Sequence, residues 1–167
     1  QRNLYDGEMI NQIDPWDYHH SSPCLHKGII YIGTEQGILL GFEAKSGKQV
    51  LRCQTLSEQT IRTTPVVSEN LVLYGDWDGV LYANDISNGS LTWKYDTKLD
   101  GTYPWPNSIL SSLVVKQGQV YFAGKSNRLY SLDLLTGKKN WHYSSTTDQW
   151  LVGGPVFAEG VLYLGSS

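Results

Sequence analysis

Short runs of apolar residues, separated by polar turns that contain glycine, recur along the chain at a nearly fixed interval. Residues 28–51, 70–93 and 118–141 align with one another without a gap, and residues 160–167 repeat their beginning. Aromatic and β-branched runs between Gly, Asn and Asp residues predict strands joined by tight turns. No apolar stripe of helical period is long enough to compete with this pattern. Each repeat therefore predicts a four-stranded antiparallel sheet, and the repetition predicts a stacked or radial series of such sheets.

The end of each repeat has its own regular spacing. An acidic residue is followed four positions later by a glycine, and four positions after that by a large apolar residue. The three sets are Glu43, Gly47 and Leu51; Asp85, Gly89 and Trp93; and Asp133, Gly137 and Trp141. We expect each glycine to adopt a positive φ in a tight turn and each acid to accept hydrogen bonds from that turn. Trp93 and Trp141 are expected to be buried between neighbouring sheets, because burial of an indole removes a large apolar area from water.

This spacing resembles the tryptophan-docking motif Ala-x-Asp-x-x-Thr-Gly-x-x-x-Trp of the PQQ-dependent (quinoprotein) dehydrogenases and their PQQ-like β-propeller relatives. The second repeat carries it at Ala83, Asp85, Asn88, Gly89 and Trp93, and the third at Ser131, Asp133, Thr136, Gly137 and Trp141. The first repeat is a weaker copy, with Gly41, Glu43, Ser46, Gly47 and Leu51. The resemblance implies an all-β fold, a β-propeller of four-stranded antiparallel blades that in this family usually number seven or eight. It also implies a periplasmic or extracellular protein.

We expect residues 1–167 to form a single PQQ-like β-propeller segment. The expected parts are the tail of a preceding blade at 1–13, full blades at about 21–56, 63–99 and 111–145, and a partial blade at 153–167. An isolated arc of blades exposes apolar edges at both sides. The segment is therefore expected to belong to a larger propeller, or to pair with another chain that completes it.

The charge and hydropathy of the chain bear on nucleic-acid binding and on membrane insertion. The formal net charge is −3 with scattered basic residues, so we expect no nucleic-acid partner. No apolar run is long enough to predict a transmembrane segment.

One face of the predicted propeller gathers aromatic and charged residues. The connections from each fourth strand to the next first strand lie on the same face as the turns between second and third strands. Loops on a rigid scaffold are where binding residues concentrate. The candidates for contact with a protein, a peptide or a small ligand are Trp16, Asp17, His20, Arg62, Trp77, Tyr103, Trp105 and Trp150. The alternative is that these polar loops only face water.

We expect no metal site and no catalytic residue. Side chains of adjacent residues such as His19 and His20 point to opposite sides of an extended chain, and no further ligand spacing completes a zinc site. The run from Asp76 to Gly79 resembles the start of a calcium loop but lacks the later acids. No Ser-His-Asp arrangement can be assembled from the spacing.

The cysteines bear on the choice between an enzyme and a binding protein. The family resemblance implies that a PQQ-dependent dehydrogenase stacks its cofactor on a disulfide between adjacent cysteines, beside a calcium ion. Cys24 and Cys53 are not adjacent, and the first and fourth strands of a blade lie roughly 14 Å apart, so both are expected to be free thiols. We therefore expect a non-catalytic binding scaffold without a cofactor. The alternative is a fragment of a PQQ-dependent dehydrogenase that uses PQQ and calcium.

Overall fold

The structure is a computed structural model in which residues 21–101, 107–125, 127–146, 151 and 153–165 are described. They form three four-stranded antiparallel sheets and one two-stranded hairpin. The first sheet consists of β1 (Cys24–His26), β2 (Ile29–Gly33), β3 (Ile38–Glu43) and β4 (Gln49–Gln54). The second consists of β5 (Val66–Ser68), β6 (Leu71–Gly75), β7 (Val80–Asp85) and β8 (Leu91–Asp96). The third consists of β9 (Val114–Lys116), β10 (Gln119–Gly124), β11 (Arg128–Asp133) and β12 (Lys139–Ser144), and the hairpin of β13 (Val156–Ala158) and β14 (Val161–Tyr163).

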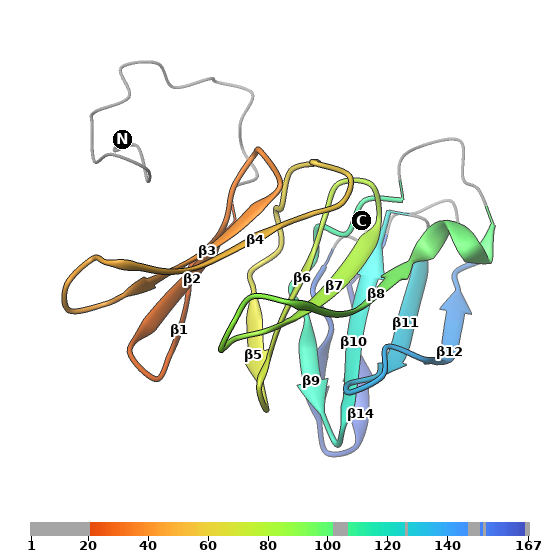
Figure 1. The fold of residues 1–167 in the computed structure, drawn as a ribbon. Coiled ribbons are helices and arrows are strands. Elements are labelled where there is room, and N and C mark those ends of the chain that lie inside the picture. Colours follow the sequence, from red (N-terminus) through yellow and green to blue (C-terminus); the bar gives the residue numbers. More distant parts are fainter. Residues whose placement is uncertain (1–20, 102–106, 126, 147–150, 152, 166–167) are drawn as a thin grey trace.

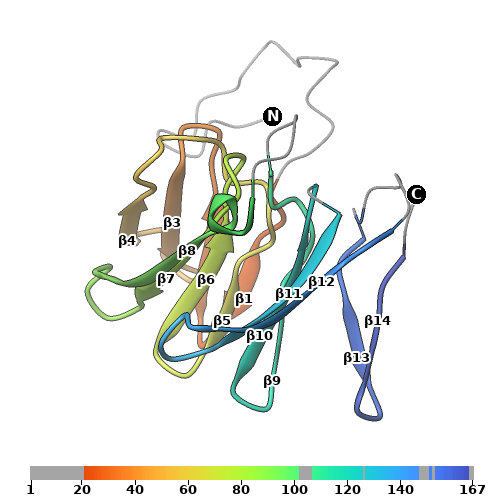
Figure 2. The ribbon, with the colours of Figure 1, turned by 90° about the vertical axis from the view of Figure 1, so that its right-hand side faces the viewer.

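The sheets and the hairpin lie side by side in the order of the sequence (Figures 1 and 2). The first strand of each contacts the first strand of the next, from β1 through β5 and β9 to β13. The described residues contain one short 3₁₀ helix, η1 (Thr97–Asp100), and no helix among them is long and apolar enough to cross a membrane. The predicted all-β fold of four-stranded antiparallel propeller blades is confirmed. The boundaries of the propeller segment stay a prediction, and its expected tail at 1–13 lies outside the described residues.

The turn between the third and fourth strands is built alike in each sheet. Its glycines have φ of 69° at Gly47, 75° at Gly89 and 67° at Gly137, as expected. The Oδ1 atom of Asp133 accepts hydrogen bonds from the backbone N of Thr136 at 2.8 Å and from its hydroxyl at 2.7 Å. These bonds lower the pKa of the Asp133 carboxyl. The acid therefore holds the turn that returns the chain into the fourth strand.

The apolar core lies between the sheets rather than within one of them. One cluster joins the first and second sheets and another joins the second and third. Aromatic pairs repeat at aligned positions of these clusters: Tyr74 stacks on Tyr82 with ring centroids 5.4 Å apart, and Phe122 stacks on Tyr130 at 4.9 Å. Packing each sheet against the next is therefore what stabilises the series.

Trp93 fastens the second sheet to the third, as the sequence predicts. Its side chain is 8% exposed, and its indole Nε1 donates a hydrogen bond to the carbonyl oxygen of Leu134 at 2.9 Å. A Cβ atom at position 137 would lie 2.5 Å from the Trp93 ring. Gly137 is thus required twice, for its positive φ and for the close approach of the indole.

The prediction that Trp141 is buried is wrong for the described residues. Its side chain is 40% exposed, with the ring of Tyr121 at 6.1 Å. Trp93 is covered by the third-to-fourth-strand turn of the following sheet, and the described residues supply only two strands after Trp141. Tyr143 on the same strand is also exposed, as are Val156, Val161 and Tyr163 of the hairpin. That another chain covers this side stays a prediction.

Both cysteines are free, as expected, and they are expected to react at different rates. Cys53 is buried, and burial raises its pKa to about 11, whereas Cys24 is half-buried. Because the thiolate is the reactive form, we expect Ellman's reagent at pH 8 to modify Cys24 quickly and Cys53 only as the protein unfolds. In denaturant, both thiols are expected to react quickly with the reagent. Two equally fast thiols in the native protein would contradict the buried position of Cys53.

Candidate functional site

The connections between sheets lie against the turns between second and third strands, as predicted. The backbone N of Trp77 donates to the carbonyl oxygen of Thr60 at 2.9 Å, and that of Lys125 donates to Ser108 at 3.0 Å. We call this side of the molecule the loop face. Its described residues include the connections 55–65 and 107–113 and the turns 34–37, 76–79 and 125 with 127.

In both described connections, a buried isoleucine packs against the end of a second strand. Ile61 is 1% exposed, and a Cβ atom at position 33 would lie 2.3 Å from its Cγ2. Ile109 holds the equivalent place beside Gly75, where a Cβ atom would lie 2.6 Å from its side chain. Because the glycines at these strand ends have no side chain, each isoleucine packs directly against the strand backbone. The loop face is therefore rigidly attached to the sheets.

Three side chains from three different segments meet on the loop face. The guanidinium carbon of Arg62 lies 4.7 Å from the centroid of the Trp77 ring, and the Nζ atom of Lys125 lies 4.9 Å from it. All three side chains are half-buried. Both distances are within the range of cation–π attraction. We call this group the Trp77 cluster.

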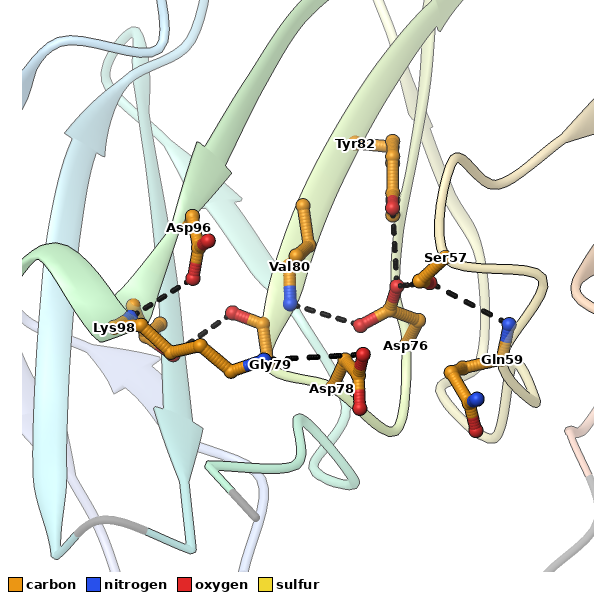
Figure 3. Close-up of polar contacts among 10 residues, drawn as sticks. Ser57, Gln59, Asp76, Asp78, Gly79, Val80, Tyr82, Asp96 and Lys98 are labelled. Atoms are coloured by element: carbon orange, nitrogen blue, oxygen red, sulfur yellow. Dashed lines mark hydrogen bonds and ion pairs between the residues drawn. The ribbon is translucent and has the colours of Figure 1, made fainter. Parts of the chain in front are cut away.

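A buried carboxylate holds the turn that carries Trp77 (Figure 3). Asp76 is fully buried. Its Oδ1 accepts from the backbone N of Val80 at 2.8 Å, and its Oδ2 accepts from the hydroxyls of Ser57 at 2.6 Å and Tyr82 at 3.0 Å. Ser57 belongs to the connection after the first sheet and Tyr82 to β7. The carboxylate therefore ties the connection after the first sheet, and the turn that carries Trp77, to β7.

Burial raises the pKa of Asp76, although the hydrogen bonds from Ser57, Val80 and Tyr82 oppose the shift. A carboxyl whose pKa is higher in the folded than in the unfolded protein stabilises the fold most below its unfolded pKa, near 3.8. That contribution is lost as pH rises through the folded pKa.

The pH dependence can be isolated with Asp76→Asn, which keeps the size of the side chain and removes the titration. We expect the free energy of unfolding of the wild type, minus that of the variant, to fall as pH rises from below 3.8 towards neutrality. Urea unfolding of both proteins across this range measures the difference. A difference that grows with pH would mean that hydrogen bonding outweighs burial at this carboxylate.

A second group of polar side chains, around Asp100, lies at the start of the connection between the second and third sheets. The Asp100 carboxylate accepts hydrogen bonds from the hydroxyl of Tyr95 and from Nζ of Lys139, and Nδ1 of His142 lies 3.7 Å from it. Burial alone would raise the pKa of Asp100, but the bonds from Lys139 and Tyr95 leave it lowered. The junction attaches η1 to β12 of the third sheet.

Of the candidates taken from the sequence, the structure brings Arg62 and Trp77 together. The others lie outside the described residues: Trp16, Asp17, His20, Tyr103, Trp105 and Trp150. Lys125 and Asp76 belong to turns of the predicted loop face but are not among the eight candidates for ligand contact. The gapless alignment carries a signal for Lys125, because it occupies the position of Trp77 in the next repeat. Asp76 has no such signal, since an acid in a polar turn is usually exposed.

The sequence of the chain matches a known protein family. The sequence family described as "Outer membrane protein assembly factor BamB" matches residues 6–167. The chain belongs to this family of PQQ-like β-propeller repeats.

Relatives of two kinds resemble the chain. The BamB outer membrane protein assembly factor of Legionella pneumophila is 23% identical over 155 residues, which cover 87% of this chain and 37% of that protein. A quinohemoprotein alcohol dehydrogenase of Comamonas testosteroni is 26% identical over 116 residues, 65% of this chain and 16% of the enzyme. The crystal structure of BamB from Moraxella catarrhalis superposes with a TM-score of 0.70 at 20% identity, covering 83% of this chain and 44% of that one. The chain thus spans less than half the length of each of these three proteins.

Proposed function

We propose that the chain is part of a non-catalytic propeller module that binds a protein or peptide partner through its loop face, in the periplasm. The observation that carries the proposal is the Trp77 cluster. Trp and Arg are enriched among the residues that dominate the binding energy of protein interfaces, where an aromatic ring lies on a rigid base. Here the base is the backbone hydrogen bond from Trp77 to Thr60 and the buried Asp76, which precedes Trp77 in the same turn.

The relatives support this compartment and this kind of partner. Several carry the name outer membrane protein assembly factor, and an assembly factor acts on other proteins. The match to their family extends over residues 6–167, whereas the match to the Comamonas dehydrogenase covers 65% of the chain. Specific partners are left to experiment.

Three features of the described residues support a module that works without the PQQ and calcium of the quinoprotein dehydrogenases. A flat quinone needs an open aromatic face, and the ring of Trp77 already has the cations of Arg62 and Lys125 within 5 Å. Cys24 and Cys53 lie on β1 and β4 and cannot form a disulfide of adjacent residues. No group of three or more metal-ligating side chains occurs in the described part of the chain. We therefore derive no step through this cofactor.

Site-specific photo-crosslinking in the intact protein tests the proposal. Benzoylphenylalanine in place of Gln59, an exposed residue of the loop face next to Thr60, is expected to give a discrete adduct with an outer-membrane protein. The adduct should disappear in a Trp77→Ala background. The control places the same probe at Lys45, which is exposed in the turn between β3 and β4 at the opposite end of the strands. Equal adducts from both positions, or an adduct indifferent to Trp77→Ala, would contradict a binding role for the loop face.

A further inference from the structure

We infer that Thr63 is the positioning residue of the Trp77 cluster, and that Ser21, just before β1, holds Thr63 in place. Both side chains are buried, so they would act on a partner only through the residues that they hold. The inference rests on the proposed function and deepens it, because it names the buried groups that give the binding site its shape.

The first step is the placement of Arg62 relative to Trp77. Ile61 forms an antiparallel bridge with Asp76. In this register Arg62 lies opposite Gly75, and its diagonal neighbour on the same face is Trp77. Diagonal neighbours on one face are within reach of long and aromatic side chains. The register therefore accounts for the 4.7 Å between the guanidinium carbon of Arg62 and the centroid of the Trp77 ring.

The second step is the side chain of Thr63, which is fully buried. Its Oγ1 accepts a hydrogen bond from the backbone N of Gly75 at 2.9 Å and donates one to the carbonyl oxygen of Gly75 at 3.3 Å. Arg62 thus lies between Ile61 and Thr63, and each of these neighbours is bound to one of the two residues that precede Trp77. The connection and the turn of Trp77 are therefore held in one register.

The third step is Ser21, which connects Thr63 to the first sheet. The Oγ atom of Ser21 accepts from the backbone N of Gly33 at 3.2 Å and donates to the carbonyl oxygen of Thr63 at 2.8 Å. Gly33 ends β2 and Gly75 ends β6, so the two hydroxyls link the second strands of neighbouring sheets. A shift of the first sheet against the second would therefore move Thr63 and, with it, the Trp77 cluster.

The same arrangement recurs in the next connection, which supports a positioning role. The Oγ atom of the buried Ser111 accepts from the backbone N of Ala123 at 3.1 Å and donates to its carbonyl oxygen at 2.9 Å. Ala123 precedes Lys125 by the same spacing by which Gly75 precedes Trp77. Both side chains that the second and third sheets bring to the cluster thus follow a strand whose end is held by a buried hydroxyl.

The position of Arg62 over Trp77 can be followed by NMR in the intact protein without a ligand. Protons above an aromatic ring are shifted upfield by its ring current. The Nε proton of Arg62 is therefore expected upfield in the wild type and near its ordinary position in Trp77→Ala. We expect Thr63→Val, which keeps the shape of the side chain and removes the hydroxyl, to lose most of this upfield shift. Thr63→Ser, which keeps the hydroxyl, is expected to retain it.

Thr97→Val is the matched control, because Thr97 is also fully buried and the substitution is the same. The Thr97 hydroxyl donates to the carbonyl oxygen of Gly79 at 2.8 Å, at the other end of the turn 76–79, and the backbone N of Thr97 keeps its own bond to that oxygen. We expect Thr97→Val to leave the Arg62 resonance unchanged. Equal losses of the upfield shift in Thr97→Val and Thr63→Val would mean a general loosening of the turn and would overturn the inference.

Ser21→Ala tests the same path without altering any group bound to Gly75, and it decides the question if Thr63→Val does not fold. We expect it to reduce the upfield shift of Arg62, because the carbonyl oxygen of Thr63 loses its donor. Since Ser21 acts through Thr63, the double variant is expected to lose no more of the shift than Thr63→Val alone. An unchanged Arg62 resonance in Ser21→Ala, or equal resonances in Thr63→Val and Thr63→Ser, would overturn the inference.

Photo-crosslinking from position 59 separates this inference from the proposed function. The adduct is expected to weaken in Thr63→Val and to return in Thr63→Ser. If the wild type gives no adduct while the Arg62 resonance responds as expected, the positioning role of Thr63 stands and the proposed function falls. An adduct that persists in Thr63→Val after the upfield shift is lost would overturn the inference as an account of the binding site.

Discussion

Replacing Trp93 with alanine is expected to lower the free energy of unfolding by about 3–5 kcal/mol, the usual cost of deleting a buried aromatic side chain. The indole is 8% exposed, packs on the backbone turn at Gly137, and donates to the carbonyl oxygen of Leu134. Alanine leaves a cavity between the second and third sheets and removes the donor to that carbonyl. Neither sheet can move to fill the space without disturbing its own hydrogen-bonded strands.

Urea unfolding followed by circular dichroism measures the loss, and Leu91→Ala is the matched control. Leu91 lies two residues earlier on β8 and is 43% exposed, so its truncation is expected to cost less than about 1 kcal/mol. Similar losses for the two variants would show that the second and third sheets are not joined through Trp93.

Replacing Asp76 with alanine is expected to cost about 2–4 kcal/mol. The substitution leaves the backbone N of Val80 and the hydroxyls of Ser57 and Tyr82 without their common acceptor in a buried site. The cost of burying the carboxylate is removed at the same time, which keeps the net loss below the sum of three charged hydrogen bonds. Because the same carboxylate holds the turn of Trp77, the loop-face crosslink from position 59 is expected to weaken as well.

Asp78→Ala is the control for Asp76→Ala, because it removes a neighbouring carboxylate of the same turn. Its ion pair with Lys98 is partly exposed, so its removal is expected to change stability by less than about 1 kcal/mol. Thermal unfolding measures the loss of stability, and photo-crosslinking from position 59 measures the loss of partner binding. A neutral Asp76→Ala would mean that the turn is held by its backbone alone.

The features that repeat were predictable from the sequence. Strand order, the positive φ of Gly47, Gly89 and Gly137, and the burial of Trp93 all follow from interactions that recur within one repeat or between a repeat and the next. Trp141 shows the limit of this reasoning. The sequence around it matches that of Trp93, but the turn that would cover its ring belongs to a following repeat of which the described residues hold two strands.

The candidate site was predictable only in part, because it depends on which loops meet. The alignment places Trp77 and Lys125 at equivalent positions of neighbouring repeats, yet their contact depends on the angle between sheets. The burial of Asp76 depends likewise on Ser57, which arrives from the preceding connection, 19 positions away in the sequence. Strand propensity and motif spacing describe single segments of the sequence. The contacts of Trp77 and Asp76 instead arise from the packing of one sheet against the next.

Calorimetric titration of the intact protein with PQQ in the presence of calcium tests the central claim, that this is a binding module and not a quinoprotein. Two partly exposed cations beside one indole give weak attraction for a tricarboxylate, so we predict no dissociation constant tighter than about 100 μM. A dissociation constant at or below about 1 μM, near −8 kcal/mol, that is lost in Arg62→Ala would contradict the account and assign the loop face to the cofactor of a dehydrogenase.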